Sequence, residues 1–364
     1  MAEEHFTYSS TDLFSGIGGI RLGFQEAFDP EVGGYFSVDY ACEINKRSQA
    51  TYKHNFTRTE KIFEDITVVP VEDFGYTDIC MAGFPCQTFS KAGKRQGFND
   101  NRGVLYQNVV EICRHWKPMV IFCENVKELY TRDHGSALDR IVADLSMNGE
   151  YQVFKKVLNS KNFGVPQNRT RLYIVAFRKG ILPEDQTFEF PSENGPEVHL
   201  DSIIEKGPVA EHYYLSTRYL NTLKRHKERQ MERHNGFGYV VRDVEKGIAG
   251  TLVCGGMGKE RNLLIDKKCE PKMDTTNREY IRAMTPTEWK RLQGFPESFT
   301  FPDSVAMTYQ YFQLANSVTV SVIKAIAEAI KPILDNYLAS GGVRNIVTGN
   351  QRVCTEVQTV RRYI

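Results

Sequence analysis

Short apolar runs of strand length alternate with helical-looking stretches through the first half of the chain. This alternation is typical of an α/β fold built around a mostly parallel sheet. One strand is poorly marked, because the run Ser9-Ser10-Thr11 is polar where a buried first strand should be apolar. The pattern therefore predicts an α/β fold with strands over residues 35–41, 78–82, 119–123, 151–158 and 171–177.

The pattern of apolar and polar residues changes after Arg178. Prolines interrupt the apolar pattern, the charged run 224–229 follows, and glycine-rich segments appear at 235–238 and 254–258. A chain of 364 residues is long enough for one large domain and a smaller lobe. We expect a first domain over 1–185 and 305–338, a second lobe over 186–304, and a C-terminal tail over 339–364 that shows no clear pattern.

Two helices are clearly marked in the second half of the chain. Thr285 is typical of an N-cap, Pro286 of a first helical position and Glu288 of a capping box, and Gly294 ends that helix. Between residues 317 and 338 apolar residues recur at helical spacing. This spacing predicts a packed helix that returns to the first domain.

Composition narrows the class of protein. Hydrophobic residues make up 41% of the chain and charged residues 25%, as in a folded, soluble protein. No apolar run approaches the roughly 20 residues that cross a bilayer, and the first residues carry acids where a signal peptide needs basic charge. We therefore expect a cytoplasmic protein without a membrane partner. The net charge of +1 neither favours nor excludes binding to phosphates, because a protein that binds phosphates can concentrate its basic residues on one face.

The eight cysteines form no C-x-x-C pair, and no two histidines show the close spacing of a zinc site. We therefore expect no bound metal. In a reducing compartment most of these cysteines should be free, buried thiols. A catalytic cysteine consequently needs independent evidence.

The glycine-rich segment 12–23 is typical of a tight turn from strand into helix, where a ligand approaches the backbone. Glu43 follows the next strand, where a doubly wound fold places an acid that binds a ribose diol. Together these signals favour a nucleoside-bearing cofactor, although the spacing is not G-x-G-x-x-G and a turn without a ligand is the alternative. Asp65 could accept from an adenine amino group while Ile66 packs on the ring; the alternative is a solvated loop acid.

Cys86 follows a buried strand, at the carboxyl edge of the sheet where open α/β folds place their active sites. The polar, basic and glycine-punctuated stretch 87–103 is typical of a lid over an anionic substrate. Glu124 comes at the end of the next strand, and Arg169 and Arg171 stand two apart before another. The two arginine side chains are expected on one face, beside a polar substrate. Taken singly, these residues could be a buried cysteine, a strand-end acid and surface arginines.

Motifs along the chain resemble, in the same order, those of the C5-cytosine-specific DNA methyltransferase family, over about residues 12 to 335. The resemblance implies a Rossmann-like, doubly wound, mostly parallel sheet with a second, smaller target-recognition domain. Ala315 departs from the family, which usually has glycine there, and we expect the added methyl group to be tolerated. The matching segments are Asp12 to Gly19, Gly83-Phe84-Pro85-Cys86-Gln87, Glu124-Asn125-Val126, Gln167-Asn168-Arg169-Thr170-Arg171, Arg291-Leu292-Gln293-Gly294-Phe295-Pro296 and Asn316-Ser317-Val318.

The resemblance implies transfer of a methyl group from S-adenosyl-L-methionine to carbon 5 of a cytosine in duplex DNA, after the base has been flipped out of the stack. Cys86 would add to C6, while Glu124, kept partly protonated by burial, would hydrogen-bond N3 and the exocyclic amine. Arg171, supported by Arg169, would neutralise charge at O2. The positions implied for cofactor contacts are Phe14, Gly16, Gly18, Glu43, Ile44, Asp65, Ile66, Pro85, Leu105, Asn316 and Ser317.

The second lobe is expected to recognise the DNA sequence. Thr251-Leu252 resembles the Thr-Leu pair of family recognition regions, and 254–262 offers donors for guanine edges. The alternative is a glycine-rich surface loop whose cations touch only phosphate. Residues 255–262 are similar to members that recognise GG(N)CC-type palindromes. The positions implied for DNA contacts are Gln87, Ser90, Lys94, Arg95, Thr251, Gly255, Gly256, Lys259 and Arg261.

We therefore expect a monomeric DNA methyltransferase, the protective methylase of a restriction-modification system, with a restriction endonuclease for the same site as a candidate partner. Two alternatives stay open: a methyltransferase of this family that acts on transfer RNA, and a non-catalytic nucleic-acid-binding protein that retains the fold. A dinucleotide oxidoreductase is disfavoured by the glycine spacing and by the lack of a proton-donating His or Tyr constellation.

Overall fold

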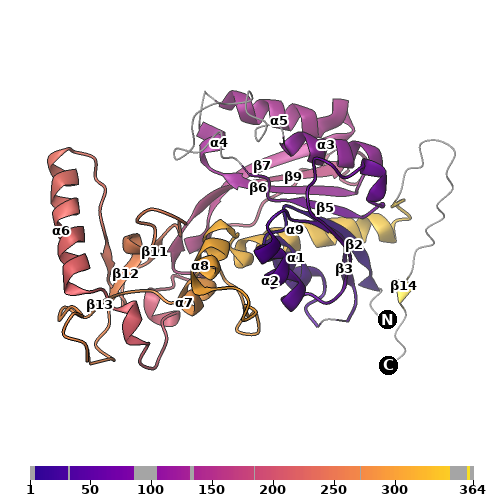
Figure 1. Ribbon diagram of the computed structural model, residues 1–364. Helices are drawn as coiled ribbons and strands as arrows, with labels where there is room; N and C mark the ends of the chain where they lie inside the picture. The colour runs from indigo at the N-terminus through magenta and orange to yellow at the C-terminus, as the bar shows by residue number, and fades with distance from the viewer. Residues whose placement is uncertain are drawn as a thin grey trace. The chain divides into compact units, whose positions relative to one another are not determined.

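The computed structural model describes residues 5–31, 33–85, 105–131, 135–183, 185–270, 272–344 and 359–360. These residues form two compact units (Figure 1). Unit 1 comprises Met1–Leu158, Thr170–Ser192 and Val322–Ile364, and unit 2 comprises Asn159–Arg169 and Glu193–Ser321. Residues 159–169 and 305–321, which the sequence pattern assigned to the first domain, pack within unit 2.

Unit 1 is built on a mostly parallel sheet, as predicted. The described strands stand in the order β4-β3-β2-β5-β6-β9-β7. The first five of these are parallel to their neighbours, and β9 runs antiparallel to β6. The bounds are β2 Tyr8–Leu13, β3 Phe36–Cys42, β4 Thr59–Phe63, β5 Ile79–Ala82, β6 Val120–Val126, β7 Tyr151–Asn159 and β9 Thr170–Arg178.

Strand β2 contains the polar run that counted against a strand at this place in the sequence. Ser10 and Thr11 are buried, but their hydroxyl groups are not left without partners. Ser10 Oγ donates to the carbonyl oxygen of Ser37 at 2.7 Å, and Thr11 Oγ1 lies 3.0 Å from Thr77 Oγ1. Because these partners lie on neighbouring segments of the sheet, a polar strand can be buried at little cost.

Helices cover both faces of this sheet (Figure 1). On one face α3 and α5 pack in a buried cluster with Ile121 and Cys123 of β6. On the other face Phe24 of α1 makes an edge-to-face contact with Phe122, the residue of β6 that points the opposite way. Alternate side chains of β6 therefore enter two different cores. The helix bounds are α1 Gly19–Phe28, α2 Lys46–Asn55, α3 Leu105–Trp116, α4 Glu128–Thr131, α5 Ser136–Ser146 and α9 Val320–Ala339.

The chain stays attached to unit 1 beyond the end of α9. Arg178 donates to the carbonyl oxygens of Arg344 at 2.6 Å and of Val343 at 2.5 Å. Arg344 in turn forms an ion pair of 2.5 Å with the buried carboxylate of Asp78. Further on, β14 (Thr359–Val360) pairs with β1 (His5–Phe6). The first residues of the expected C-terminal tail are thus anchored by buried charges.

Unit 2 combines short strands with three helices among its described residues. A small sheet has the order β10-β12-β13, and β11 pairs in parallel with β8. The predicted helix over 286–292 is confirmed, with the capping box at Thr285, and Gly294 after it has a φ of +73°. The bounds are β8 Gln167–Asn168, α6 Thr217–Glu232, β10 Val241–Arg242, β11 Ala249–Gly250, β12 Leu263–Ile265, β13 Ile281–Ala283, α7 Pro286–Leu292 and α8 Met307–Asn316.

Arg282 of β13 is fully buried between two carboxylates. Its Nε donates to Asp266 Oδ2 at 2.8 Å, and its Nη atoms donate to the two carboxylate oxygens of Glu288 at 2.8 Å each. Glu288 also accepts from the backbone N–H of Thr285, the N-cap of α7. The buried arginine and the start of α7 therefore form one network.

Replacing Arg282 by alanine should strongly destabilise unit 2. The substitution leaves two buried carboxylates without a cation, which costs about 3–5 kcal/mol of unfolding free energy. Urea unfolding of the full chain measures the loss. The matched control is Arg278→Ala, at an exposed arginine that lies 3.8 Å from Asp274 Oδ1, and it should change stability by less than about 1 kcal/mol. Equal stability of the two variants would contradict a supporting role for the network.

Candidate functional site

The segment after β5 leads to the predicted nucleophile. Gly83 donates its backbone N–H to the carbonyl oxygen of Leu13 at 3.3 Å, which fixes the exit of β5 beside β2. Phe84 is buried and Pro85 is half-buried. The predicted residues Cys86, Gln87, Ser90, Lys94 and Arg95 lie outside the described residues.

Glu124 and Arg171 form an ion pair on adjoining strands. Arg171 Nε lies 3.3 Å from Glu124 Oε1, and the side chains are 14% and 12% exposed, respectively. Glu124 lies within β6, which continues to Val126, so the expected end of that strand at residue 123 was wrong. Antiparallel pairing sets Val126 opposite Arg171. Within the described part of the chain, Glu124 Oε1 has no hydrogen-bond partner, although the guanidinium is close.

Asn125 links the Glu-Asn-Val segment to the segment that precedes Cys86. Its Nδ2 donates to the carbonyl oxygen of Phe84 at 3.1 Å, and both residues are buried. Asn125 belongs to the Glu124-Asn125-Val126 motif but had no predicted role. Only its place beside Glu124 hinted at a function, because a backbone partner 41 positions away cannot be deduced from one sequence.

Arg169 has different partners from Arg171. Its guanidinium is buried in unit 2 and donates to the carbonyl oxygens of Ala315 at 3.4 Å and Ser317 at 2.5 Å. These carbonyls lie at the C-terminal end of α8, where a cation is favourable. Arg169 thus contacts the end of α8, whereas Arg171 contacts Glu124.

Ala315 lies in the last turn of α8. It is buried and is not among the described residues with positive φ. The methyl group that distinguishes it from the family's usual glycine therefore adds no backbone strain.

The glycine-rich loop between β2 and α1 has an unusual backbone. Phe14, Gly16 and Gly18 have φ of +57°, +55° and +85°, a region that is costly for a residue with a side chain such as Phe14. A Cβ added at Gly16 would meet no atom within 4 Å, whereas one at Gly18 would lie 2.2 Å from the ring of Phe56. The loop thus leaves open space at Gly16 and close contact at Gly18.

Glu43 is fixed beside this loop. One carboxylate oxygen accepts from the backbone N–H of Gly16 at 2.9 Å and the other from that of Asn45 at 2.7 Å. Burial raises the pKa of Glu43, and the two amides oppose that rise. The neighbouring Ile44 is a large apolar side chain that is 68% exposed. An acid and an uncovered apolar surface thus stand side by side at the end of β3.

The other expected cofactor positions differ in their surroundings. Asp65 accepts hydrogen bonds from the backbone N–H and the hydroxyl of Thr67, which lower its pKa. Ile66 is buried in the core of unit 1, and Leu105, the first residue of α3, packs against that core. In unit 2, Asn316 is exposed at the end of α8 and Ser317 is half-buried.

Asp12 is a candidate functional residue to which the sequence analysis gave no role. It is fully buried at the end of β2, below the glycine-rich loop. Its Oδ2 accepts from Tyr52 Oη at 3.4 Å, and Oδ1 has no hydrogen-bond partner among the described residues. Arg21, also buried, donates to the same tyrosine oxygen at 3.1 Å. Burial raises the pKa of Asp12 to about 7, against the opposing effects of Arg21 and Tyr52.

Several of the quoted motifs meet in unit 2 through buried glutamines. Gln167 Nε2 donates to Gln293 Oε1 at 3.1 Å, and Gln167 Oε1 accepts from the backbone N–H of Leu252 at 3.2 Å. Gln293 Nε2 donates to the carbonyl oxygen of Leu314 at 2.7 Å, and Gln293 Oε1 accepts from Thr319 Oγ1 at 3.1 Å. Four segments far apart in sequence are therefore held by one polar network.

The expected recognition segment is bound at its base to the same region. Thr251 Oγ1 donates to the carbonyl oxygen of Asn168 at 2.8 Å, and Cys254 Sγ lies 3.5 Å from Asn316 Oδ1. Gly255 and Gly256 are exposed and have positive φ. Thr251 thus directly follows β11, and the two glycines lie in a turn farther along the chain.

Lys259 and Arg261, the two cations expected to contact DNA, differ in their surroundings. The Lys259 ammonium lies 3.8 Å from the centre of the Tyr311 ring, and burial lowers its pKa. Arg261 is exposed. A base contact by Lys259 would thus compete with its cation–π contact, whereas Arg261 is accessible.

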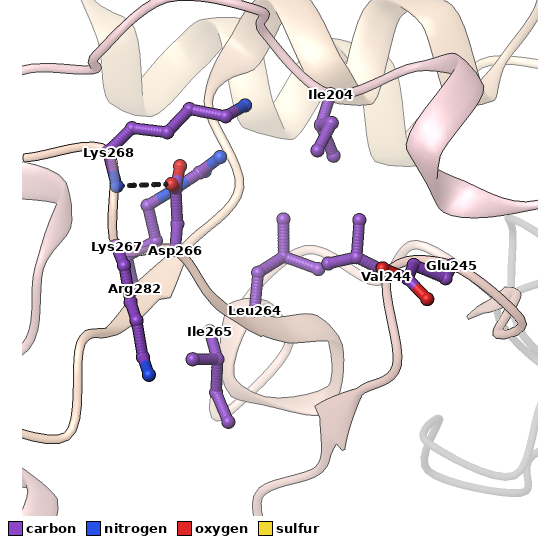
Figure 2. A pocket seen from close by; sticks show the side chains of 9 residues that line it. All are labelled: Ile204, Val244, Glu245, Leu264, Ile265, Asp266, Lys267, Lys268 and Arg282. Atoms are coloured by element: carbon purple, nitrogen blue, oxygen red, sulfur yellow. Dashed lines mark hydrogen bonds and ion pairs between the residues drawn. The ribbon is translucent and has the colours of Figure 1, made fainter.

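A pocket of about 400 Å³ opens elsewhere in unit 2, and Figure 2 shows the side chains that line it. None of the predicted site residues is among them. The buried Arg282 network forms part of the wall, with Asp266 also accepting from the backbone N–H of Lys268. The lining residues are Ile204, Val244, Glu245, Leu264, Ile265, Asp266, Lys267, Lys268 and Arg282.

Neither a metal-binding cluster nor a membrane-spanning helix occurs within the described ranges. No group of three or more His, Cys, Asp or Glu side chains there could hold a metal ion. No helix there is long and apolar enough to cross a membrane.

Comparison with known proteins gives consistent matches. The sequence profile of the family described as C-5 cytosine-specific DNA methylase matches residues 8–332. The Type II methyltransferase M.HpaII of Haemophilus parainfluenzae is 43% identical over 342 residues, which are 92% of this chain and 91% of that protein. The Type II methyltransferase M.NlaX of Neisseria lactamica is 40% identical over 323 residues, which are 89% and 96% of the two chains.

Among solved structures, the S. pombe Dnmt2 methyltransferase has a TM-score of 0.69 at 20% sequence identity. The match covers 90% of this chain and 99% of that chain. At this identity the likeness shows a shared fold.

Replacing Asp12 by asparagine should change how stability depends on pH. The folded-state pKa of Asp12 is raised from 3.8 to about 7, so the folded chain holds this proton more tightly than the unfolded chain. Its contribution is fully present below about pH 4 and is lost as the pH rises through about 7. The wild type should therefore lose stability relative to Asp12→Asn between about pH 4 and pH 7, by a few kcal/mol.

Thermal unfolding at several pH values measures this difference, with Asp303→Asn, at an exposed loop carboxylate, as the control. Parallel curves for the wild type and Asp12→Asn would contradict a buried titration at this site.

Proposed function

The chain belongs to the C-5 cytosine-specific DNA methylase family and is a DNA cytosine-5-methyltransferase, and from that premise we propose that it uses S-adenosyl-L-methionine and a covalent bond from Cys86 to the base. Carbon 5 of cytosine is a poor nucleophile, so the ring needs activation before it can accept a methyl group. A thiolate that adds transiently to the neighbouring carbon supplies this activation.

The observation that carries the proposal is the set of contacts at the carboxyl ends of β5 and β6. Glu124 and Arg171 form a largely buried ion pair, and Asn125 binds the carbonyl oxygen of Phe84. Cys86 follows Phe84 by two residues, so only a short length of chain separates it from this anchored carbonyl. These contacts support a site in which an acid and a guanidinium act beside the thiol.

We assign the following roles. The Cys86 thiolate adds to C6, an S–C6 bond forms, and the electron pair of the C5–C6 double bond moves toward C5 and the ring carbonyl. Glu124 hydrogen-bonds N3 and the exocyclic amine, and Arg171 stabilises the negative charge that develops at O2. Once C5 has gained the methyl group, a base removes the C5 proton, and the electron pair of that C–H bond re-forms the C5–C6 double bond, breaks the S–C6 bond and releases the thiolate. An edge of the base would satisfy the buried Glu124 Oε1, which has no hydrogen-bond partner among the described residues.

The residues of unit 1 fit S-adenosylmethionine. Open space at Gly16 leaves room for a ligand against the loop backbone, and the buried Ser15 Oγ has no hydrogen-bond partner among the described residues. Glu43 would accept from the ribose hydroxyls, and the exposed Ile44 would cover one face of the adenine. We keep Asp65, Leu105, Asn316 and Ser317 as further proposed contacts. When bound, the cofactor supplies an electrophilic methyl group to C5.

The substrate we propose is a cytosine flipped out of a short duplex sequence, because its C6 cannot be reached inside the stack. The relatives named above are called Type II methyltransferases. From these names we infer a protective methylase of a restriction-modification system, with a cognate endonuclease as partner. Target recognition is assigned to unit 2 and its segment 254–262, and a GG(N)CC-type site remains the proposed target.

The covalent step can be tested with a duplex that contains 5-fluorocytosine. The reaction contains S-adenosylmethionine, because the adduct can reverse until C5 is methylated; fluorine then cannot leave C5 as a cation, so elimination is blocked and the S–C6 bond should persist through a denaturing gel. The wild type and Cys269→Ser should give this complex. Cys86→Ser should not give it, and should lose methyl transfer by more than about a thousandfold while still binding duplex DNA. Full residual transfer by Cys86→Ser would show that another group is the nucleophile.

The same preparation separates the alternative functions. Labelled cofactor is incubated with duplex DNA and with total RNA, and methylated cytosines are mapped. Label in RNA alone would favour a methyltransferase that acts on transfer RNA. Binding of DNA without methyl transfer would favour a non-catalytic protein.

The cofactor can be tested by thermal shift. S-adenosylmethionine at about 100 times its Kd should stabilise the wild type by about 2.7 kcal/mol, and NAD should not. Glu43→Gln removes charged hydrogen bonds worth about 1.5–3 kcal/mol, so its affinity should fall about 10- to 100-fold. Glu64→Gln, at an acid that is 59% exposed beyond β4, is the control and should bind normally. Stabilisation by NAD instead, or normal binding by Glu43→Gln, would contradict the assignment.

A further inference from the structure

Helix α6 carries a row of arginines along one side. At 3.6 residues per turn, Arg218, Arg225 and Arg229 fall within an arc of about 40°, and all three side chains are exposed. The buried Leu220 and Leu223 lie on the opposite side of the helix. These three residues, called here the arginine row, extend over about 17 Å of helix.

The other cations in the middle of α6 are already engaged. Lys224 Nζ lies 2.5 Å from Glu279 Oε1, and Lys227 Nζ lies 4.9 Å from the centre of the Tyr239 ring. The ion pairs found among the described residues include none of the arginine row. The exposed Glu228 and Glu232 stand to one side of the row and form no ion pair with it within the described part of α6. The guanidinium groups of the row therefore face solvent and have no ion-pair partner among the described residues.

Helix α6 is joined to the segment 254–262 by two independent contacts. Tyr219 Oη donates to Glu260 Oε1 at 2.8 Å. Met257 packs against the cluster that contains Leu220 and Leu223. Helix α6 is thus packed against the segment assigned to base recognition.

We propose that the arginine row binds phosphates of duplex DNA and so adds affinity that does not depend on the DNA sequence. The inference rests on the proposed function, because it takes duplex DNA as the substrate. A guanidinium pairs with two phosphate oxygens at once. The row spans about five base-pair steps at 3.4 Å each. Phosphate contacts carry no sequence information, so the row positions the protein and does not specify the site.

The test compares four forms of the full chain. The first two are the wild type and the triple variant Arg218→Gln, Arg225→Gln, Arg229→Gln. The third replaces the same arginines by lysine and keeps their charge. The matched control is Lys206→Gln, Lys267→Gln, Lys272→Gln, which removes three charges from exposed positions of unit 2 that do not belong to α6. All substituted side chains are exposed, so thermal unfolding should be unchanged.

Affinity is measured from low to moderate salt on a duplex that the wild type methylates and on one that it does not. Each lost phosphate contact lowers the slope of log K against log salt by about 0.9. The glutamine variant should therefore show a slope smaller by about 2–3 and binding at least about tenfold weaker at low salt on both duplexes. Its preference between the duplexes should be unchanged. The lysine variant should retain most of the slope, and the control should match the wild type.

Three results would overturn the inference alone: a glutamine variant with the wild-type slope, a control that loses as much as the glutamine variant, or a change of preference without a change of slope. A wild-type chain that neither binds nor methylates duplex DNA would overturn the proposed function as well. The two failures are therefore distinguishable.

Discussion

The candidate site depends on the reversal of strand β9 in an otherwise parallel run. In a wholly parallel sheet each strand brings its carboxyl end to the edge where such folds bind ligands. Because β9 runs antiparallel to β6, its amino end reaches that edge, and Arg171 stands opposite Val126. The guanidinium can then approach Glu124, 3.3 Å away. Neither charge could be buried alone at acceptable cost, so the strand reversal allows both to be held in a largely buried site.

Much of the fold follows from the sequence where the cause is local. Continuous apolar runs located strands of unit 1 to within a few residues, and Thr285, Pro286 and Glu288 predicted the start of α7 correctly. Strand β2 was doubted because the partners of its hydroxyl groups lie on other segments. Helix α8 was not predicted. It has no side-chain cap at Ala306, and half of its apolar residues are aromatic. Where stability comes from distant partners, one sequence carries no trace of it.

The same division applies to the site. The pairing of Glu124 with Arg171 could be anticipated, because two strand ends at one sheet edge bring their side chains together. The partners of Arg169 and Lys259 could not be anticipated. Arg169 binds carbonyls about 150 positions away, and Lys259 lies over a ring 52 positions away. A sequence motif indicates that a residue type is required at a position. The contacts that this residue makes are set by tertiary packing.

Overall composition says little about how this chain meets a polyanion. Its 46 basic and 45 acidic residues nearly cancel. Yet in unit 2 Asp266 and Glu288 are buried against Arg282, and Glu279 is paired with Lys224, so these acids contribute little to the potential outside the protein. The exposed guanidinium groups of α6 have no such partner among the described residues. A sum over residues counts a buried carboxylate and an exposed arginine as cancelling, although only the arginine faces solvent. The field that a phosphate meets is therefore set by which charges are paired within the fold.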